Sequence, residues 1–255
     1  MNLVELETLC KEYNKITKGI VDFDKYTCYA ITHHSTVIEG STLTESEVIN
    51  LLEYGKTATN KPFEHHQMVF DHYKALLFII NHAKKKNKID LDFIKKTASI
   101  LMKNTGSIVN TVLGTYDIST GDLRLSSVRA GSRSFPEYKK VPTLLNNLIK
   151  EVNIGLENSK TFKEKLELAF KFHFDFVSIH PFGDGNGRTS RLMMNFVQAY
   201  FKLPLSPVFK ENRLKYINTL ERTREKNDIT EFYKFMFYQY EKFLKNELKN
   251  LKKKK

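Results

Sequence analysis

His180-Pro-Phe-Gly-Asp-Gly-Asn-Gly-Arg-Thr-Ser-Arg191 is the stretch from which this chain can be interpreted. It brings together a histidine, a carboxylate, alternating glycines and two arginines. These residue types supply a base, a metal ligand, a backbone that can approach an anion closely, and positive charge. They are the recurring parts of a site for phosphate chemistry. The stretch therefore predicts such a site between two helices.

The histidine ends the helix that precedes this stretch. His180 lies directly before Pro181, where the α conformation becomes unfavourable, so the helix should stop there. Imidazole titrates near neutral pH and can take a proton from an attacking hydroxyl, which makes His180 the candidate general base. An isolated histidine at a helix end would more often be a packing residue. His173, seven residues earlier on the same helical face, is expected to be a buried support for the helix end.

The glycines prepare a cradle for an anion. Gly183, Gly185 and Gly187 alternate with Asp184 and Asn186, and a helix is predicted to begin immediately afterwards. Glycines let backbone N–H groups come close to a ligand, and a helix N-terminus favours negative charge. A glycine run alone often marks only a turn.

The charged residues decide between a turn and a site. Arg188 and Arg191 are three residues apart in the first helical turn and share a face. Two cations at the positive end of a helix are unfavourable unless an anion or a carboxylate lies nearby, and triphosphate oxygens would supply that anion. Asp184 is the carboxylate of the loop and the candidate Mg²⁺ ligand, since Mg²⁺ is usually held by one or two carboxylates plus phosphate oxygens. The alternative is that Asp184 only caps the helix.

Helical periodicity dominates the rest of the chain and predicts an all-α bundle with a small β element. The predicted helices cover residues 64–83, 90–103, 143–152, 161–179, and about 188–202, 211–225 and 229–250. Thr44-x-x-Glu47 and Asp228-x-x-Glu231 are predicted capping boxes. Residues 114–142 contain glycine and proline punctuation and short runs such as Leu123–Val128. They predict a β-hairpin or an extended flap, with an irregular surface loop as the open alternative.

Composition and charge limit the classes of function. The 255 residues carry a net charge of +12, and half of it lies in residues 242–255, where seven lysines face one glutamate. A solvated helix end explains these lysines better than a nucleic-acid contact, because no aromatic–basic platform accompanies them. No stretch approaches the ~20 apolar residues of a membrane span. Cys10 and Cys28 have no CxxC spacing, so we expect free thiols, a reducing compartment and a cytoplasmic location.

The stretch 180–191 resembles the signature of the Fic-domain family, His-x-Phe-x-(Asp/Glu)-Gly-Asn-Gly-Arg-x-x-Arg, at every specified position. Fic proteins share an α-helical fold and mostly transfer AMP from ATP to a Ser, Thr or Tyr hydroxyl of a protein, releasing pyrophosphate. The resemblance implies an Mg²⁺- and ATP-dependent protein adenylyltransferase on a Fic-type bundle with a small β-hairpin flap. The implied roles are His180 as base, Asp184 as Mg²⁺ ligand, Gly185, Asn186 and Gly187 as anion hole, and Arg188 and Arg191 on the outer phosphates.

The resemblance extends loosely over residues 60–240. Val128, Arg129, Ala130 and Gly131 look like the family's substrate-aligning flap, along which a target would add an extra strand. Tyr216 lies where the family often has an aromatic residue near the adenine pocket, although Ile217 occupies the adjacent position. The Doc toxins of this family, which phosphorylate, carry Lys where this chain has Gly187. That difference supports AMP transfer.

A second motif lies far upstream. Ser35-Thr-Val-Ile-Glu39-Gly40 matches the (Ser/Thr)-x-x-x-Glu-(Gly/Asn) inhibitory motif of one class of Fic proteins; a helix end with a glycine C-cap is the alternative. Glu39 would pair with Arg191 and occupy the space of the γ-phosphate, which misorients the α-phosphate for attack. The same glutamate supports removal of AMP in some relatives.

These observations divide the chain into an N-terminal helical segment with the inhibitory motif (1–59), a catalytic core (60–241) and a basic C-terminal helix end (242–255). The expected partner is a protein with a hydroxyl side chain, this chain itself included, and the family's habit of dimerising makes a homodimer an expectation. The alternatives are a de-AMPylase, a transferase with another nucleotide or phosphodiester donor, and a non-enzymatic nucleic-acid-binding regulator that uses the basic C-terminus.

Overall fold

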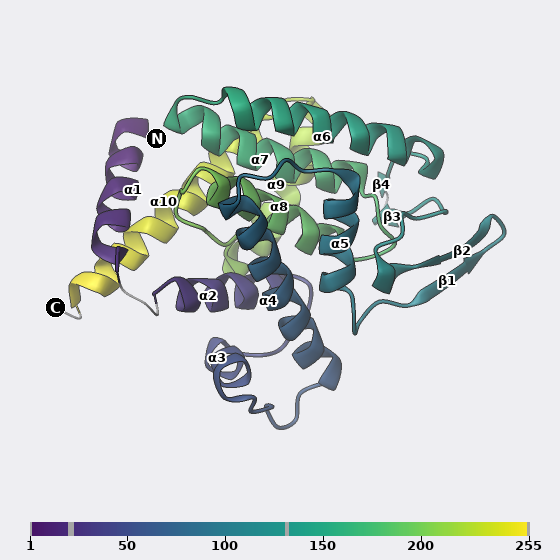
Figure 1. The fold of residues 1–255 in the computed structure, drawn as a ribbon, viewed down its shortest axis with the longest axis horizontal. Coiled ribbons are helices and arrows are strands. Elements are labelled where there is room, and N and C mark those ends of the chain that lie inside the picture. The colour runs from purple at the N-terminus through teal and green to yellow at the C-terminus, as the bar shows by residue number, and fades with distance from the viewer. Residues whose placement is uncertain (1, 20–22, 131–132, 254–255) are drawn as a thin grey trace.

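The computed structural model describes residues 2–19, 23–130 and 133–253, and ten α-helices lie in this part of the chain. At the centre are α7 (Phe162–Ile179) and α8 (Asn186–Tyr200), which are joined by the loop 180–185 and pack along each other. Around them lie α4 (Phe63–Lys84), α5 (Leu91–Leu101) and α6 (Val141–Asn158) (Figure 1). The predicted all-α bundle with a small β element is confirmed.

Helix α8 lies deepest in the bundle. Every residue from 188 to 198 is buried, including the two arginines of its first turn. A helix that is buried on all sides must satisfy its polar side chains internally. Asn195 and Gln198 do so, because their amides bond to each other and to Ser206 in the following loop. The loop 180–185 is thereby fixed at the start of a rigid element.

Local sequence sets the ends of α7. Thr161 accepts from the backbone N–H of Glu164, whose carboxylate accepts from Thr161 in return, so a capping box starts the helix. The helix ends at His180, whose φ of 55° is left-handed. The predicted capping box of Thr44 and Glu47 is confirmed at the start of α3 (Glu45–Tyr54).

The other predicted box, at Asp228 and Glu231, is wrong. Helix α10 (Thr230–Lys253) starts later than the box requires. The Asp228 carboxylate accepts instead from the backbone N–H of Thr230 at 3.0 Å and from its hydroxyl at 2.6 Å. This is the local bond of an Asx turn, with which a capping box competes.

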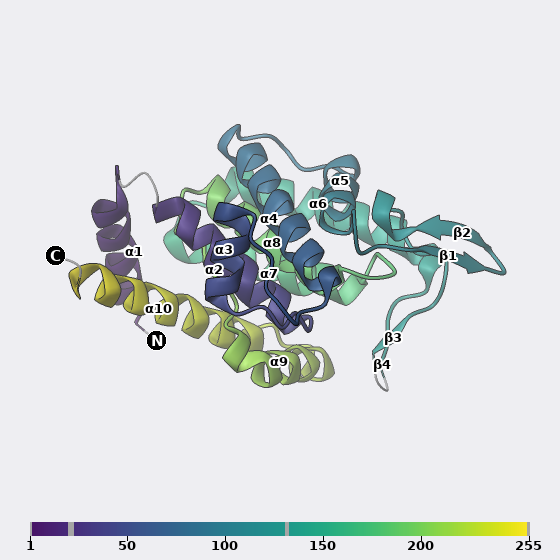
Figure 2. The same cartoon turned by 90° about the horizontal axis from the view of Figure 1, so that it is seen from below.

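Two small antiparallel hairpins extend from one end of the bundle (Figures 1 and 2). The larger pairs β1 (Ile108–Thr111) with β2 (Gly114–Asp117), and the smaller pairs β3 (Arg129–Ala130) with β4 (Arg133–Ser134). The larger hairpin begins before the region in which the sequence predicts β structure. The run Leu123–Val128, for which the sequence left a hairpin, a flap or an irregular loop open, is irregular: the N–H of Arg124 donates to the carbonyl of Pro181, and the carbonyl of Val128 accepts from Phe135 beyond β4.

The N-terminal helices share one hydrophobic core with the rest of the bundle. Leu6 and Cys10 of α1 (Leu3–Thr17) and Ile31 of α2 (Phe23–Ile38) belong to the same cluster of buried side chains as the apolar residues of α7. Helices α1 and α10 lie side by side (Figures 1 and 2). Among the described helices, none combines the length and the apolar character needed to cross a bilayer.

Ion pairs between α1 and α10 offset part of the C-terminal charge. Lys245 lies 3.4 Å from Glu5, and Lys252 lies 2.9 Å from Glu12. Such exposed pairs contribute little stability, because water and salt screen them. They do place acidic partners opposite the lysines of residues 242–253.

Candidate active site

His180 lies at the junction of α7, the loop and the smaller hairpin. Its Nδ1 lies 3.3 Å from the carbonyl oxygen of Val177. Phe135, which follows β4, stacks on the imidazole with ring centroids 3.8 Å apart and an angle of 21° between the planes. The candidate base is therefore held by its own helix and by the segment predicted to align a target.

The loop after His180 is shaped by close contacts. Asn186 accepts from the N–H of Phe182 and donates to the Phe182 carbonyl oxygen, both at 2.9 Å. The Asn186 side chain thus closes the loop, and its amide faces the loop's own backbone. A side chain at Gly183 would meet the ring of Tyr116, because the first side-chain atom would lie 2.9 Å from the ring.

The helix entrance requires a glycine. Gly185 has a φ of 78° and is the N-cap of α8, and an added Cβ would lie 2.7 Å from Met102 Sδ. The left-handed conformation, which favours glycine, turns the chain into the helix within one residue. The N–H groups of the first turn are then free of intrahelical partners, as at any helix start.

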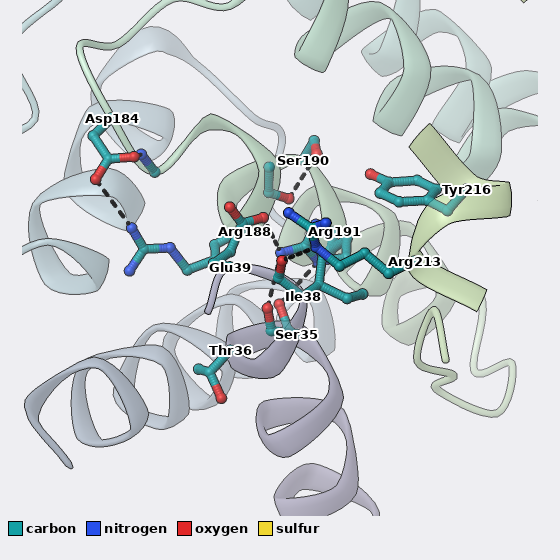
Figure 3. Close-up of polar contacts among 12 residues, drawn as sticks. Ser35, Thr36, Ile38, Glu39, Asp184, Arg188, Ser190, Arg191, Arg213 and Tyr216 are labelled. Atoms are coloured by element: carbon teal, nitrogen blue, oxygen red, sulfur yellow. Dashed lines mark hydrogen bonds and ion pairs between the residues drawn. The ribbon is translucent and has the colours of Figure 1, made fainter. Parts of the chain in front are cut away.

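Asp184 and Arg188 face each other across this entrance. The Asp184 side chain is 63% exposed, and its Oδ2 lies 3.4 Å from Nη2 of Arg188 (Figure 3). Arg188 is only 3% exposed, and its Nε and Nη1 have no hydrogen-bond acceptor among the described residues. A buried guanidinium with unsatisfied donors is costly unless a ligand accepts from them. The pair thus combines an exposed carboxylate with a buried cation, two of whose three donor nitrogens lack acceptors among the described residues.

Arg191 is bound to the end of α2 (Figure 3). Its Nε donates to Ser35 Oγ at 2.9 Å, and its Nη2 donates to the Ser35 carbonyl at 3.0 Å and to Glu39 Oε1 at 2.7 Å. Residues 35 and 39 are more than 150 positions from Arg191 in the sequence, so this contact fixes the N-terminal segment on the glycine loop. The added Cβ at Gly187 would lie 2.5 Å from Glu39 Oε1.

The end of α2 is locked in place from both sides. Gly40 has a φ of 105°, and the N–H groups of Glu39 and Gly40 bond to the carbonyls of Thr36 and Val37. This is a glycine C-cap. Gly40 therefore ends the helix, as the alternative interpretation predicted, and it also belongs to the stretch 35–40 that contacts Arg191. Arg213, from α9 (Arg213–Lys226), donates its Nε to the carbonyl of Ile38 at 2.7 Å.

Electrostatics keep the Glu39–Arg191 pair charged. Burial alone would raise the pKa of Glu39, but the charge and hydrogen bond of Arg191, with the charges of Arg188 and Arg213, together hold the pKa below its ordinary value. Burial alone would lower the pKa of Arg191, but Glu39 and Tyr216 together outweigh burial and the pKa is raised. His72 of α4 lies close by, and burial together with the charges of both arginines holds its pKa well below the ordinary value. His72 is therefore neutral near pH 7.

The two supporting residues contact each other. His173 is fully buried in α7, and its Nε2 lies 2.8 Å from the hydroxyl of Tyr216 of α9. The rings also stack, with centroids 5.6 Å apart. Burial holds the pKa of His173 well below its ordinary value. The pair is therefore a neutral contact that anchors α9 on the helix that carries His180.

The predicted flap residues lie partly outside the described chain. Arg129 and Ala130 form β3, and Val128 precedes them and accepts from the N–H of Phe135 at 3.3 Å. Gly131 lies outside the described residues. The flap thus starts and ends next to His180.

Sequence reasoning missed Arg124. Its side chain is 1% exposed, and its Nε donates to the carbonyl of His180 at 2.8 Å. It also bonds to the carbonyls of Ser126 and Pro136. A single arginine in an irregular segment carries no sequence signal for such contacts. The Tyr116 ring, which comes from β2 and lies against Gly183 of the glycine loop, was also missed.

Residues 88–198 match the model of the Fic/DOC family. The chain is 30% identical over 206 residues to the protein adenylyltransferase Fic of Aedes aegypti, and 31% identical over 205 residues to that of Drosophila melanogaster. These matches cover 80% of this chain but 38% and 39% of the two relatives. The chain therefore spans about two fifths of the length of these relatives.

Solved structures share the fold. A Fic-domain-containing signaling protein from Bacteroides thetaiotaomicron superimposes with a TM-score of 0.83, at 22% identity and with 97% of each chain covered. Fic-1 from C. elegans (residues 134–508) superimposes with a TM-score of 0.77, at 22% identity, covering 99% of this chain and 72% of that one. The helical arrangement, N-terminal helices included, is that of these proteins.

Proposed function

Because this chain is a Fic-domain protein, we propose that it is a protein adenylyltransferase held inactive by its own α2. In this proposal the acceptor is a Ser, Thr or Tyr hydroxyl of a protein. The hydroxyl oxygen attacks the α-phosphorus of ATP, the bond from the α-phosphorus to the bridging oxygen breaks, and pyrophosphate leaves. The proton of the hydroxyl passes to His180.

The observation that carries the proposal is the pair of arginines in the first turn of α8. Arg188 is buried and has donors without acceptors among the described residues, while the acceptors of Arg191 come from the end of α2. Buried guanidinium groups at a helix N-terminus bind phosphate oxygens well, because geometry, dipole and charge act together. Polyphosphate oxygens are therefore the ligand that suits this turn best.

His180 suits the role of base for geometric reasons. One side of its ring is held by the Val177 carbonyl and its face by Phe135, so its orientation is fixed before any acceptor arrives. A positioned base contributes roughly 10²–10⁴-fold to such reactions. The adjoining hairpin, with Val128 and Arg129, would present the acceptor segment as an added strand.

The residues present also fit a magnesium ion. Asp184 presents a largely exposed carboxylate beside the phosphate cradle, and Mg²⁺ is usually held by one or two carboxylates together with phosphate oxygens. Asp184 would hold the ion, which would neutralise charge on the phosphates when bound. Gly185, Asn186 and Gly187 would surround the phosphates with the first N–H groups of α8.

Glu39 would keep the enzyme inactive. Its carboxylate occupies the Arg191 guanidinium at 2.7 Å, so a nucleotide phosphate must displace it before Arg191 can bind that phosphate. Ser35 and Gly40 support the inhibitory contact, the first by accepting from Arg191 and the second by capping the helix. Inhibition would therefore depend on the position of the whole C-terminal turn of α2.

Other features bear on partners and location. The ion pairs of Lys245 and Lys252 with α1 support a structural role for the C-terminal lysines over nucleic-acid binding. Cys10 and Cys28 are buried free thiols, which supports the cytoplasmic location inferred from the sequence. The homodimer stays a prediction.

The test compares wild type, Glu39→Gly and Glu39→Gly/His180→Ala after incubation with ATP and Mg²⁺, by intact mass. A gain of one AMP group in Glu39→Gly alone is the expected result. Transfer that persists in the double variant would remove His180 from its role. Transfer equal in wild type and Glu39→Gly would remove the inhibitory role of Glu39, and a parallel incubation of AMP-modified protein tests the reverse reaction.

A further inference from the structure

Arg124 joins three segments of chain that meet at the candidate active site. Its Nε donates to the carbonyl of His180 at 2.8 Å, its Nη1 donates to the carbonyl of Ser126 at 2.7 Å, and its Nη2 donates to the carbonyl of Pro136. Its own backbone N–H donates to the carbonyl of Pro181 at 3.1 Å. One side chain therefore links the base to both ends of the flap.

The burial of this arginine indicates that its guanidinium holds main-chain carbonyls in place. The side chain is 1% exposed, and the acceptors described for its guanidinium are main-chain carbonyls, none of which carries a full negative charge. Burial lowers the pKa of Arg124. A buried cation is costly without hydrogen bonds, and the planar guanidinium suits several acceptors at fixed angles. Lysine has one ammonium group and cannot span the same three carbonyls.

The flap depends on this link because it has little structure of its own. β3 and β4 contribute two residue pairs, Arg129 with Ser134 and Ala130 with Arg133, and two-stranded hairpins are at best marginally stable alone. The bond from the N–H of Phe135 to Val128 adds one contact. The bonds of Arg124 to Ser126 and Pro136 hold the two limbs at their base and orient them relative to His180.

The carbonyl of His180, the third acceptor, needs a hydrogen-bond donor from outside its helix. It belongs to the end of α7, where carbonyls lack intrahelical partners and where the helix dipole favours a cation. The left-handed conformation of His180 turns this carbonyl out of the helix and toward Arg124. The backbone of the base and the backbone of the flap therefore share one donor group.

We propose that Arg124 is a positioning residue that sets the place of the protein acceptor relative to His180. The proposal rests on the proposed transferase function and adds to it. Arg124 would act on the alignment of the acceptor hydroxyl, and the phosphate cradle of Arg188 and Arg191 would not need it. The loss of Arg124 should therefore affect transfer to protein more than transfer to water.

The experiment uses the full chain with Glu39→Gly as parent and compares Arg124→Lys, Arg124→Gln and a control, Arg222→Lys. Arg222 is exposed on α9, so its variant makes the same chemical change without touching the site. Three quantities are measured: AMP incorporated into the chain itself by intact mass, AMP released by hydrolysis of ATP, and the Kd for ATP by calorimetry. Amide hydrogen exchange is recorded for residues 126–136 and for α4.

Both Arg124 variants should lose about tenfold or more in AMP incorporation, since misplaced reacting groups cost that much or more. Hydrolysis and the Kd for ATP should stay within about threefold of the parent, because water needs no flap. Exchange should quicken in residues 126–136 and not in α4. Arg222→Lys should change nothing.

Equal losses of incorporation and hydrolysis would overturn the proposal, as would unchanged exchange in the flap. Arg124→Lys keeps the charge and nearly the size of the side chain, so it still tests the proposal if Arg124→Gln does not fold. An unchanged Kd for ATP shows that the phosphate cradle of Arg188 and Arg191 is folded in the variant. A Glu39→Gly parent that transfers AMP to no acceptor would instead refute the proposed function. In that case the role assigned to Arg124 falls with it, even if the exchange results agree.

Discussion

Replacing Glu39 with glycine should change nucleotide affinity and protein stability in opposite directions. The carboxylate lies 2.7 Å from Arg191, which is 3% exposed, while the Glu39 side chain is 32% exposed. A fully buried ion pair costs about 3–5 kcal/mol when one partner is removed, and an exposed pair about 0–1 kcal/mol. Arg191 keeps both contacts with Ser35. We therefore take about 2 kcal/mol for the Glu39 contact.

On the proposed function this free energy also opposes nucleotide binding, because Glu39 occupies Nη2 of Arg191, to which a phosphate would bind. At about 1.4 kcal/mol for each factor of ten, its removal should tighten the Kd for ATP roughly thirtyfold. The same substitution should lower the free energy of unfolding of the nucleotide-free protein by about 2 kcal/mol. Calorimetry with ATP and Mg²⁺ gives the first quantity, and urea denaturation gives the second.

Two further variants make the test specific. Glu39→Gln keeps the shape and removes the charge, so it should lie between wild type and Glu39→Gly in both measurements. Glu225→Gln, an exposed change on α9, should match wild type. An ATP affinity that is the same within about twofold in wild type and Glu39→Gly would refute the reasoning, since the contact would then not compete with the nucleotide.

Three other predictions concern titration and stability. Because the pKa of Glu39 is lowered on folding, its contribution to stability is present above pH 4.5 and is lost as the pH falls through its folded value. The stability gap between wild type and Glu39→Gln in thermal denaturation should thus be constant from neutral pH down to about pH 5 and narrow below it; a gap that widens there contradicts this. Burial raises the pKa of Cys10 to about 11 and that of Cys28 to about 12. At pH 8 iodoacetamide should label both in unfolded protein only, and labelling of the native protein at the unfolded rate would count against this. Thr161→Ala should lower the free energy of unfolding by about 1 kcal/mol through loss of the α7 cap, with Thr219→Ala, at a half-buried position inside α9, as the control that should cost less.

The helices were predictable because their signals are local. Apolar spacing placed α4, α5, α7, α8 and α10 close to their observed bounds. The capping box of Thr44 predicted the start of α3. The glycine loop was predictable as a site because residue types with complementary chemistry lie within one short stretch. Its two arginines do enter the same first turn, yet one faces Asp184 and the other the end of α2.

The hairpins were predicted poorly because their strands are mostly exposed. Ile108 and Val112 point into solvent, so β1 and β2 lack the alternation of apolar and polar residues that marks a half-buried strand. The run from Leu123 does alternate, but Arg124 points inward to bind carbonyls that are up to 56 residues away. Contacts of a side chain with distant main-chain atoms leave no periodic trace in a sequence.

The close contact between position 187 and Glu39 limits the substitutions that evolution can make at position 187. Any residue other than glycine at position 187 would place its Cβ 2.5 Å from Glu39 Oε1, so the end of the Glu39 side chain would have to move. On the proposed function, a side chain at position 187 should therefore weaken the contact of Glu39 with Arg191, so the glycine and the inhibitory glutamate should be kept or lost together.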